Sequence, residues 1–176
     1  GTQTAGLSFG GNTPAPGMIS ATNEYNGSSW TAGGTMGTAV YNFGSAGTQT
    51  SALAFGGETG SVIATTQEYD GSSWTTGGDL NVARYANAGA GANNSAALSF
   101  GGTSPSSPST TAAEQYDGTS WTSVANLPSS QVSAGGFGDT TNAVSAAGFN
   151  PPSTNLSTTF EWTGPGVPQT EDIDVT

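Results

Sequence analysis

The stretch Leu53-Ala54-Phe55-Gly56-Gly57, followed at residues 67–74 by Gln-Glu-Tyr-Asp-Gly-Ser-Ser-Trp, recurs along the chain and decides its fold. The glycine pair is found at Gly10-Gly11, Gly56-Gly57 and Gly101-Gly102, and we place a degenerate fourth copy at Gly148-Phe149. The spacings are therefore 46, 45 and 47 residues. The aromatic markers are Tyr25, Tyr69 and Tyr116, with Trp162 as the fourth copy, and Trp30, Trp74 and Trp121. A period of about 40–50 residues with such markers predicts an all-β fold of the propeller type.

Each unit is expected to hold four short strands. The second strand covers residues 5–9, 52–55 and 96–100, where large apolar side chains alternate with serine or alanine. The third and fourth strands form a hairpin that ends at each tyrosine and resumes at each tryptophan, because Asn26-Gly27, Asp70-Gly71 and Asp117-Gly118 are strong turn signals. Residues 41–47, 85–91 and 132–138 carry mostly small side chains. They are predicted to form the innermost strands, which converge on a central axis.

Counting strands leaves the ring incomplete. The first of about four units lacks an innermost strand, and the fourth strand of the last unit is expected to be lost at Pro165-Gly166-Val167-Pro168. We therefore assign residues 1–164 to the repeat units and residues 165–176 to an acidic tail or a closing strand. Residues 171–176 could fold back as the missing strand. We favour the alternative, a longer or multi-chain propeller, because an Asp-Ile-Asp-Val strand would be bulky and charged at the axis. Gly1-Thr2-Gln3-Thr4 recurs within the repeats, so we also expect the chain to be trimmed or part of a longer one.

Composition limits the partners. The net charge is −11, with Arg84 as the single basic residue, and this charge repels nucleic acid phosphates and anionic membrane surfaces. We expect neither as a partner and expect no membrane insertion, because no apolar run approaches about 20 residues. The repeat position of Arg84 holds Val40 and Gln131 in sister units. Arg84 is therefore predicted to be dispensable to the fold.

Few side chains remain for catalysis. The sequence has no histidine, cysteine or lysine, which removes the usual zinc sites, nucleophile–histidine pairs and Schiff bases. A pair of carboxylates could still hydrolyse glycosides, but Glu24, Glu68 and Glu161 recur in the repeat and are interpreted as part of the frame. Asp70 and Asp117 are interpreted as turn formers rather than calcium ligands. We predict a non-enzyme with no catalytic residues, metal or cofactor, and the binding residues stay unassigned.

The joint spacing of Gly-Gly, Tyr and Trp over residues 5–164 resembles the kelch repeat. This resemblance implies a β-propeller. Some kelch propellers are copper oxidases similar to galactose oxidase, but their histidine, tyrosine and cysteine-modified tyrosine site has no counterpart here. The repeated sequences Phe-Gly-Gly and Glu-Tyr-Asp-Gly-Ser-Ser-Trp resemble more particularly the repeats of low-charge kelch-like structural proteins from tailed phages of marine bacteria. This closer resemblance implies a virion component such as a fibre, appendage or surface decoration.

Three functions follow as hypotheses. The first is a non-catalytic structural or display protein, located in the virion or extracellularly, whose partners are other virion proteins and further copies of itself or a longer chain. The second is recognition of a host-surface glycan through the loops at residues 12–20, 58–61 and 103–109, which differ between units while the frame stays constant. The third is a secreted bacterial surface protein with kelch-like repeats.

Overall fold

The structure is a computed structural model that describes residues 1–15, 17–152, 154–164 and 169–171. Within these residues the chain forms strands, turns and loops and no helix, so the predicted all-β class is confirmed. In the described part of the chain, seventeen short strands make up four antiparallel sheets and one separate hairpin.

The sheets follow the repeat units in order. Sheet 1 contains β1 (Gly6–Phe9), β2 (Thr22–Tyr25) and β3 (Trp30–Ala32). Sheet 2 contains β4 (Gly44–Thr48), β5 (Ser51–Phe55), β6 (Thr66–Tyr69) and β7 (Trp74–Thr76). Sheet 3 contains β8 (Ala88–Asn93), β9 (Ala96–Phe100), β10 (Ala113–Tyr116) and β11 (Trp121–Ser123). Sheet 4 contains β12 (Gly135–Gly138), β13 (Ala143–Ala146), β16 (Thr159–Trp162) and β17 (Gln169–Glu171), and β14 (Phe149–Asn150) pairs with β15 (Thr154–Asn155).

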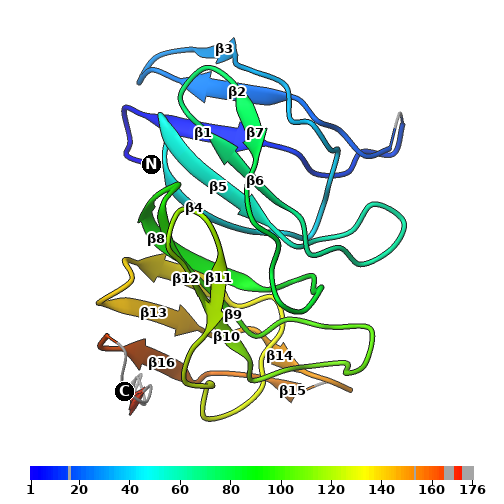
Figure 1. The fold of residues 1–176 in the computed structure, drawn as a ribbon, viewed down its shortest axis with the longest axis vertical. Helices are drawn as coiled ribbons and strands as arrows, with labels where there is room; N and C mark the ends of the chain where they lie inside the picture. The colour runs from blue at the N-terminus through cyan, green and yellow to red at the C-terminus, as the bar shows by residue number, and fades with distance from the viewer. Residues whose placement is uncertain (16, 153, 165–168, 172–176) are drawn as a thin grey trace.

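The four sheets stand side by side like blades. Within each sheet the strands pair in chain order, and Figure 1 shows sheet 1 and sheet 4 at opposite ends of the molecule. Sheet 1 has three strands, so the predicted absence of its innermost strand agrees with the described part of the chain. The described residues thus form an open series of blade-like sheets.

The predicted hairpins are confirmed to the residue. Tyr69 pairs with Trp74, and Tyr25 and Tyr116 pair with Trp30 and Trp121 in the same way. In the turn of sheet 2, the backbone N–H groups of Ser72 and Ser73 both donate to Asp70 Oδ1 over 2.8 Å. These bonds lower the pKa of Asp70 to about 2. Asp70 therefore acts as a turn former through its carboxylate, as interpreted from the sequence.

The glycine pair of the fourth unit lies one residue earlier than predicted. Ala147 has a φ of 58°, close to the 59° of Gly101, the first glycine of the third pair. Gly148 has a φ of 89°, close to the 97° of Gly57. The fourth pair is thus Ala147-Gly148 and not Gly148-Phe149. Alanine can occupy the left-handed region near 60° at a modest cost, whereas φ near 90° requires glycine.

The innermost strands begin about three residues later than predicted, but their small side chains have the predicted role. A Cβ added to Gly89 of β8 would lie 2.4 Å from the carbonyl oxygen of Ser45 in β4. A Cβ added to Gly136 of β12 would lie 2.4 Å from the carbonyl oxygen of Gly89. Successive inner strands therefore touch backbone to backbone at glycine.

The last sheet corrects a second prediction. The expected loss of its fourth strand is wrong, because β17 pairs with β16 and fills that position. Glu171 pairs with Thr159 in this sheet, so its backbone is not part of an innermost strand for sheet 1. Residues 165–168 and 172–176, which belong to the predicted tail, lie outside the described residues.

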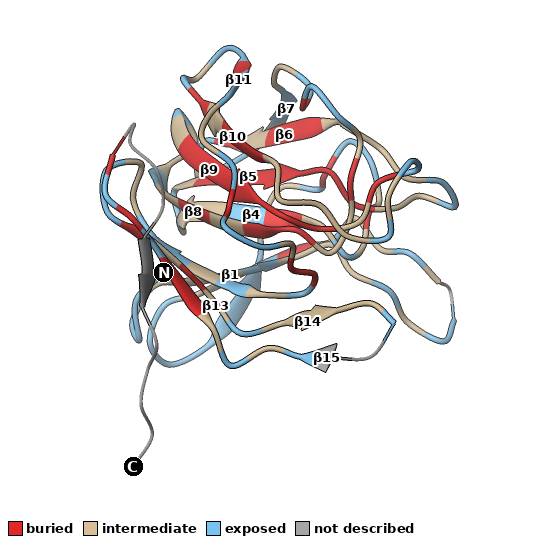
Figure 2. Ribbon diagram, turned by 90° about the horizontal axis from the view of Figure 1, so that it is seen from below, coloured by how far each residue is buried: buried red, intermediate tan, exposed pale blue. Residues whose placement is uncertain are grey.

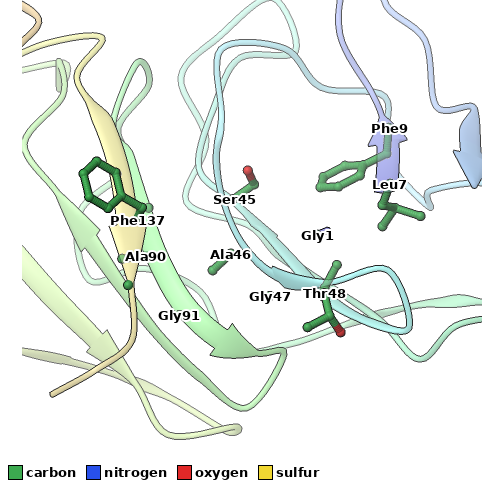
Figure 3. A pocket seen from close by; sticks show the side chains of 14 residues that line it. Gly1, Leu7, Phe9, Ser45, Ala46, Gly47, Thr48, Ala90, Gly91 and Phe137 are labelled. Atoms are coloured by element: carbon green, nitrogen blue, oxygen red, sulfur yellow. The ribbon is translucent and has the colours of Figure 1, made fainter. Parts of the chain in front are cut away.

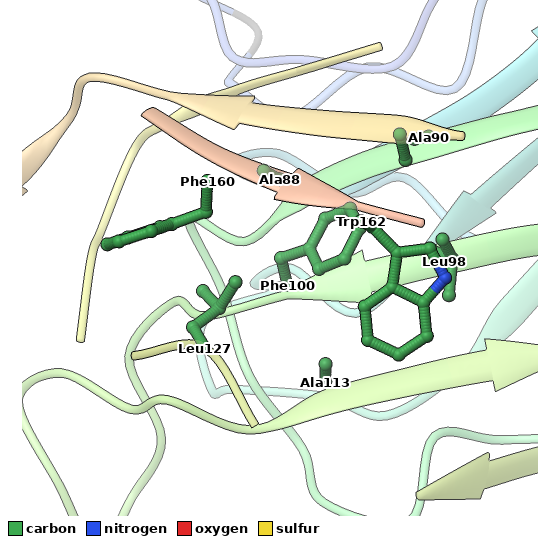
Figure 4. Packing of buried hydrophobic residues seen from close by; sticks show 9 residues of the cluster. Ala88, Ala90, Leu98, Phe100, Ala113, Leu127, Phe160 and Trp162 are labelled. Atoms are coloured by element: carbon green, nitrogen blue, oxygen red, sulfur yellow. The ribbon is translucent and has the colours of Figure 1, made fainter. Parts of the chain in front are cut away.

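The core lies between neighbouring sheets. Buried segments are concentrated in the two middle sheets, along β5, β6, β9 and β10 (Figure 2). Between sheets 3 and 4, Phe100 and Leu98 face Trp162 and Phe160, and Leu127 from the connecting loop covers them (Figure 4). Trp162 ends β16 where Tyr69 ends β6, so its assignment as a replacement for tyrosine is confirmed.

Candidate functional sites

The variable loops gather at one end of the sheets. The described parts of the loops, at residues 12–15, 17–20, 58–61 and 103–109, project to the same side of the molecule, on the right in Figure 1. The β14–β15 hairpin projects there as well and occupies the corresponding connection of sheet 4. We call this set of four connections the loop face. The chain therefore brings its least repetitive segments together.

Hydroxyl and amide groups dominate the contacts of the loop face. Ser109 Oγ donates to Asn150 Oδ1 over 3.1 Å and so links two of the loops. Thr103 Oγ1 donates to the carbonyl oxygen of Pro108 over 2.9 Å within its own loop. Such groups can both donate and accept hydrogen bonds, which suits an uncharged polar ligand.

A hollow of about 400 Å³ lies beside the inner strands (Figure 3). Its wall consists of small residues of β4, β8 and β12, together with Leu7 and Phe9 of β1 and the exposed Phe137. None of the side chains that line it is ionisable. The hollow therefore lacks the side chains needed for acid–base or nucleophilic chemistry.

The hollow coincides with the missing innermost strand of sheet 1. Leu7 and Phe9 are only half-buried, although their counterparts Leu53 and Phe55 are completely buried beneath an inner strand. Within the described residues, β1 pairs only with β2. The hollow is therefore best explained as an unfilled strand position.

The recurrent glutamates tie neighbouring sheets together. Tyr69 OH of sheet 2 donates to Glu24 of sheet 1, and Tyr116 OH of sheet 3 donates to Glu68 of sheet 2 over 2.5 Å. Burial and the Glu68 hydrogen bond raise the pKa of Tyr116 to about 12. Glu24 and Glu68 therefore have the frame role interpreted from their recurrence, whereas the third recurrent glutamate, Glu161, is exposed and accepts no hydrogen bond from a described residue.

The tryptophans reinforce the same boundaries. Trp74 Nε1 donates to Thr22 Oγ1 over 2.8 Å, and the indole packs on Phe9 with ring centroids 4.9 Å apart. Trp121 repeats the arrangement one sheet later, with 2.9 Å to Thr66 Oγ1 and 4.8 Å to the ring of Phe55. We call this combination of Tyr to Glu, Trp to Thr and Trp on Phe the sheet-boundary contact.

Arg84 has a structural role that the sequence interpretation missed. Its side chain is 1% exposed and forms an ion pair with the equally buried Glu114. It also donates to the carbonyl oxygen of Ala112 over 3.0 Å. Burial lowers the pKa of Arg84, whereas the charge of Glu114 acts to raise it. The prediction that Arg84 is dispensable to the fold is therefore wrong for this unit.

The described residues offer little to a metal ion or a membrane. They contain no group of three or more acidic, histidine or cysteine side chains that could hold a metal ion. Among them there is also no helix long and apolar enough to cross a bilayer. Comparison with protein-family models found no match, and comparison with curated proteins found none either.

Proposed function

We propose that the chain is a non-catalytic structural or display component of a virus particle, built as part of a kelch-like β-propeller. The proposal that the chain is non-catalytic rests on one observation: several of its ionisable side chains form structural contacts between or within the sheets. Glu24 and Glu68 accept from tyrosines at sheet boundaries, and Arg84 and Glu114 neutralise each other in the interior. The side-by-side antiparallel sheets and the glycine contacts between inner strands support the propeller.

The assignment to a virus particle rests on the resemblance of the repeats to kelch-like phage proteins. It implies a location in the virion or outside the cell and contact with other virion proteins. Mass spectrometry of purified particles is the direct test, and we expect this chain in many copies per particle. Particles of confirmed purity without any peptide from it would overturn the proposal.

The loop face favours a second function, recognition of a host-surface glycan. Its supporting observation is that four dissimilar connections, rich in hydroxyl and amide groups, project to one side of the molecule. A glycan array tests it directly. If a glycan binds, replacing residues 103–109 with the sequence of residues 58–61 should abolish binding while leaving the melting temperature nearly unchanged. An array with no signal above background would exclude this function for the isolated chain.

A further inference from the structure

The turn between β2 and β3 differs chemically from its counterparts in the next two sheets. Asn26-Gly27 stands where sheets 2 and 3 have Asp70-Gly71 and Asp117-Gly118. Asn26 is also the only asparagine of the chain that is followed by glycine. Because glycine has no Cβ, its backbone nitrogen is the least hindered, and such a nitrogen can attack the amide carbon of the asparagine before it.

Hydrogen bonds within this turn polarise the side-chain amide of Asn26. The N–H groups of Ser28 and Ser29 both donate to Asn26 Oδ1 over 3.0 Å, and Ser28 Oγ donates to the same atom over 2.9 Å. Attack on the amide carbon would place negative charge on this oxygen, and preorganised N–H donors stabilise a developing oxyanion. The turn therefore supplies the equivalent of an oxyanion hole to the Asn26 amide.

The attacking and the leaving nitrogen are both free of hydrogen bonds to the described residues. Neither the N–H of Gly27 nor Asn26 Nδ2 donates to any of them, and both residues are exposed to water. Asn94 gives the contrast, because its Oδ1 accepts from Ser51 Oγ and its Nδ2 donates to the carbonyl oxygen of Tyr69. Both ends of the Asn94 amide are thus held, whereas only the oxygen of Asn26 is.

The exposure of this turn does not depend on what lies beside sheet 1. Asp70, at the same place in sheet 2, is exposed although sheet 2 makes sheet-boundary contacts with both sheet 1 and sheet 3. The hairpin turns therefore stay in solvent when a sheet has neighbours on both sides. Asn26 is accordingly accessible with or without a further sheet next to sheet 1.

We propose that Asn26 is a modification site that converts to aspartate without an enzyme. The Gly27 nitrogen loses its proton to hydroxide and forms a bond to Cγ of Asn26. The bond from Cγ to Nδ2 then breaks, and Nδ2 leaves as ammonia after taking a proton from water. The cyclic imide so formed adds one water, which reopens it to aspartate or to isoaspartate. This inference is independent of the proposed function.

The two products differ in how well they keep the hairpin. Aspartate fits this turn, since Asp70 Oδ1 accepts the equivalent N–H bonds from Ser72 and Ser73. It adds one negative charge to a chain of net charge −11 and gives the first three sheets the same turn chemistry. Isoaspartate instead lengthens the main chain by one methylene between Tyr25 and Trp30, which pair across the turn.

Peptide mapping by mass spectrometry after storage of the folded chain tests the proposal. Storage at about pH 9 should convert Asn26 faster than storage at about pH 7, because the attacking nitrogen must first lose its proton. At either pH, Asn26 should convert at least about tenfold faster than any other asparagine, since only there does an unhindered nitrogen lie next to a polarised amide. Asn94 is the internal control and should stay unmodified.

Two variants separate the effect of the turn from other causes. Asp70→Asn creates a second asparagine–glycine pair in a turn with the same N–H donors, so position 70 should convert at a rate similar to that of Asn26. Asn26→Asp is the matched control and should remove the mass change at position 26. Circular dichroism before and after storage should show that each chain is folded.

Three results would overturn the proposal. The first is equal conversion of Asn26 and Asn94 in the folded chain. The second is an Asp70→Asn chain whose position 70 stays unmodified while the chain is folded. The third is an Asn26 that persists in the folded chain but converts in urea, because the turn would then protect the amide.

Discussion

The buried pair of Arg84 and Glu114 allows a prediction in which the chain supplies its own replacement residues. In sheet 3, Glu114 lies at the register position that Gln67 occupies in sheet 2. Arg84 lies at the repeat position of Val40. Gln67 and Val40 are also buried, but Gln67 is neutral and hydrogen-bonds the backbone of Thr38. The same position in the fold thus exists in a charged and in an uncharged form.

Removing one member of the pair should be costly. Both side chains are 1% exposed, so Arg84→Val leaves a buried carboxylate without its cation, and Glu114→Gln leaves a buried guanidinium without its anion. Each change should lower the free energy of unfolding by about 3–5 kcal/mol. Because a domain is stable by only about 5–15 kcal/mol, either loss is a large share of the total.

The double variant Arg84→Val/Glu114→Gln should recover most of that loss. It copies the neutral pair of sheet 2 and buries no charge, so its free energy of unfolding should lie within about 1–2 kcal/mol of the unmodified protein. The remaining cost reflects the volume lost when valine replaces arginine. A coupling of several kcal/mol between the two sites is the signature of the ion pair.

Urea unfolding followed by tryptophan fluorescence measures all four members of this cycle. Asp79→Asn is the control, because it removes an exposed charge and should change stability by less than about 0.5 kcal/mol. Additive effects of the two substitutions, or single variants as stable as the control, would refute the reasoning.

Three further predictions concern the boundaries, the glycine pair and the turns. Trp121→Ala should cost about 3–5 kcal/mol in urea unfolding, because Trp121 is 5% exposed and packs on Phe55. Trp30→Ala, at a position that is 53% exposed, should cost less than about 1 kcal/mol. Gly148→Ala should destabilise the protein by about 1–3 kcal/mol, since its Cβ would lie 2.5 Å from the carbonyl oxygen of Val132 at a φ of 89°. Ala147→Gly should change the stability by less than about 1 kcal/mol. Thermal melting that shows comparable losses for the two variants would contradict this expectation. Because the pKa of Asp70 is lowered to about 2, the contribution of the Asp70 carboxylate to folding stability is complete above about pH 4 and is lost as the pH falls through 2. Asp70→Asn, which copies Asn26, should remove this part of the acid dependence without unfolding the protein, as a melting series from pH 2 to about pH 5 can show.

The strands were predictable from the sequence because the signals that define them are local. Each Asn-Gly or Asp-Gly pair encodes its own turn, and the alternation in residues 52–55 encodes a strand without reference to any other unit. The fourth glycine pair was misplaced because Ala147 can adopt the conformation of a glycine at that position. The conformation of the pair is therefore kept in the fourth unit, whereas its first glycine is not.

The boundary contacts were not predictable because they join residues 45 to 55 positions apart across two sheets. Recurrence indicated that Glu24 and Glu68 belong to the frame, but only the packing of neighbouring sheets shows that tyrosine hydroxyls reach them. The role of Arg84 was not predictable from Val40 and Gln131 at its own repeat position, because its partner differs at a second position. Glu114 stands there, where the preceding sheet has Gln67.

Ser45 has a consequence for engineering longer chains from these units. Gly89 and Gly136, at the corresponding positions of β8 and β12, each lie against a carbonyl oxygen of the preceding inner strand. Ser45 carries a side chain there and is exposed, and none of the described strands of sheet 1 lies against it as an inner strand. The third and fourth units therefore carry the glycine that close contact with a preceding inner strand requires, whereas the second unit carries Ser45 at that position. Copying the second unit into the middle of an array would require Ser45→Gly, since a single hydroxymethyl group would otherwise hold two neighbouring sheets apart.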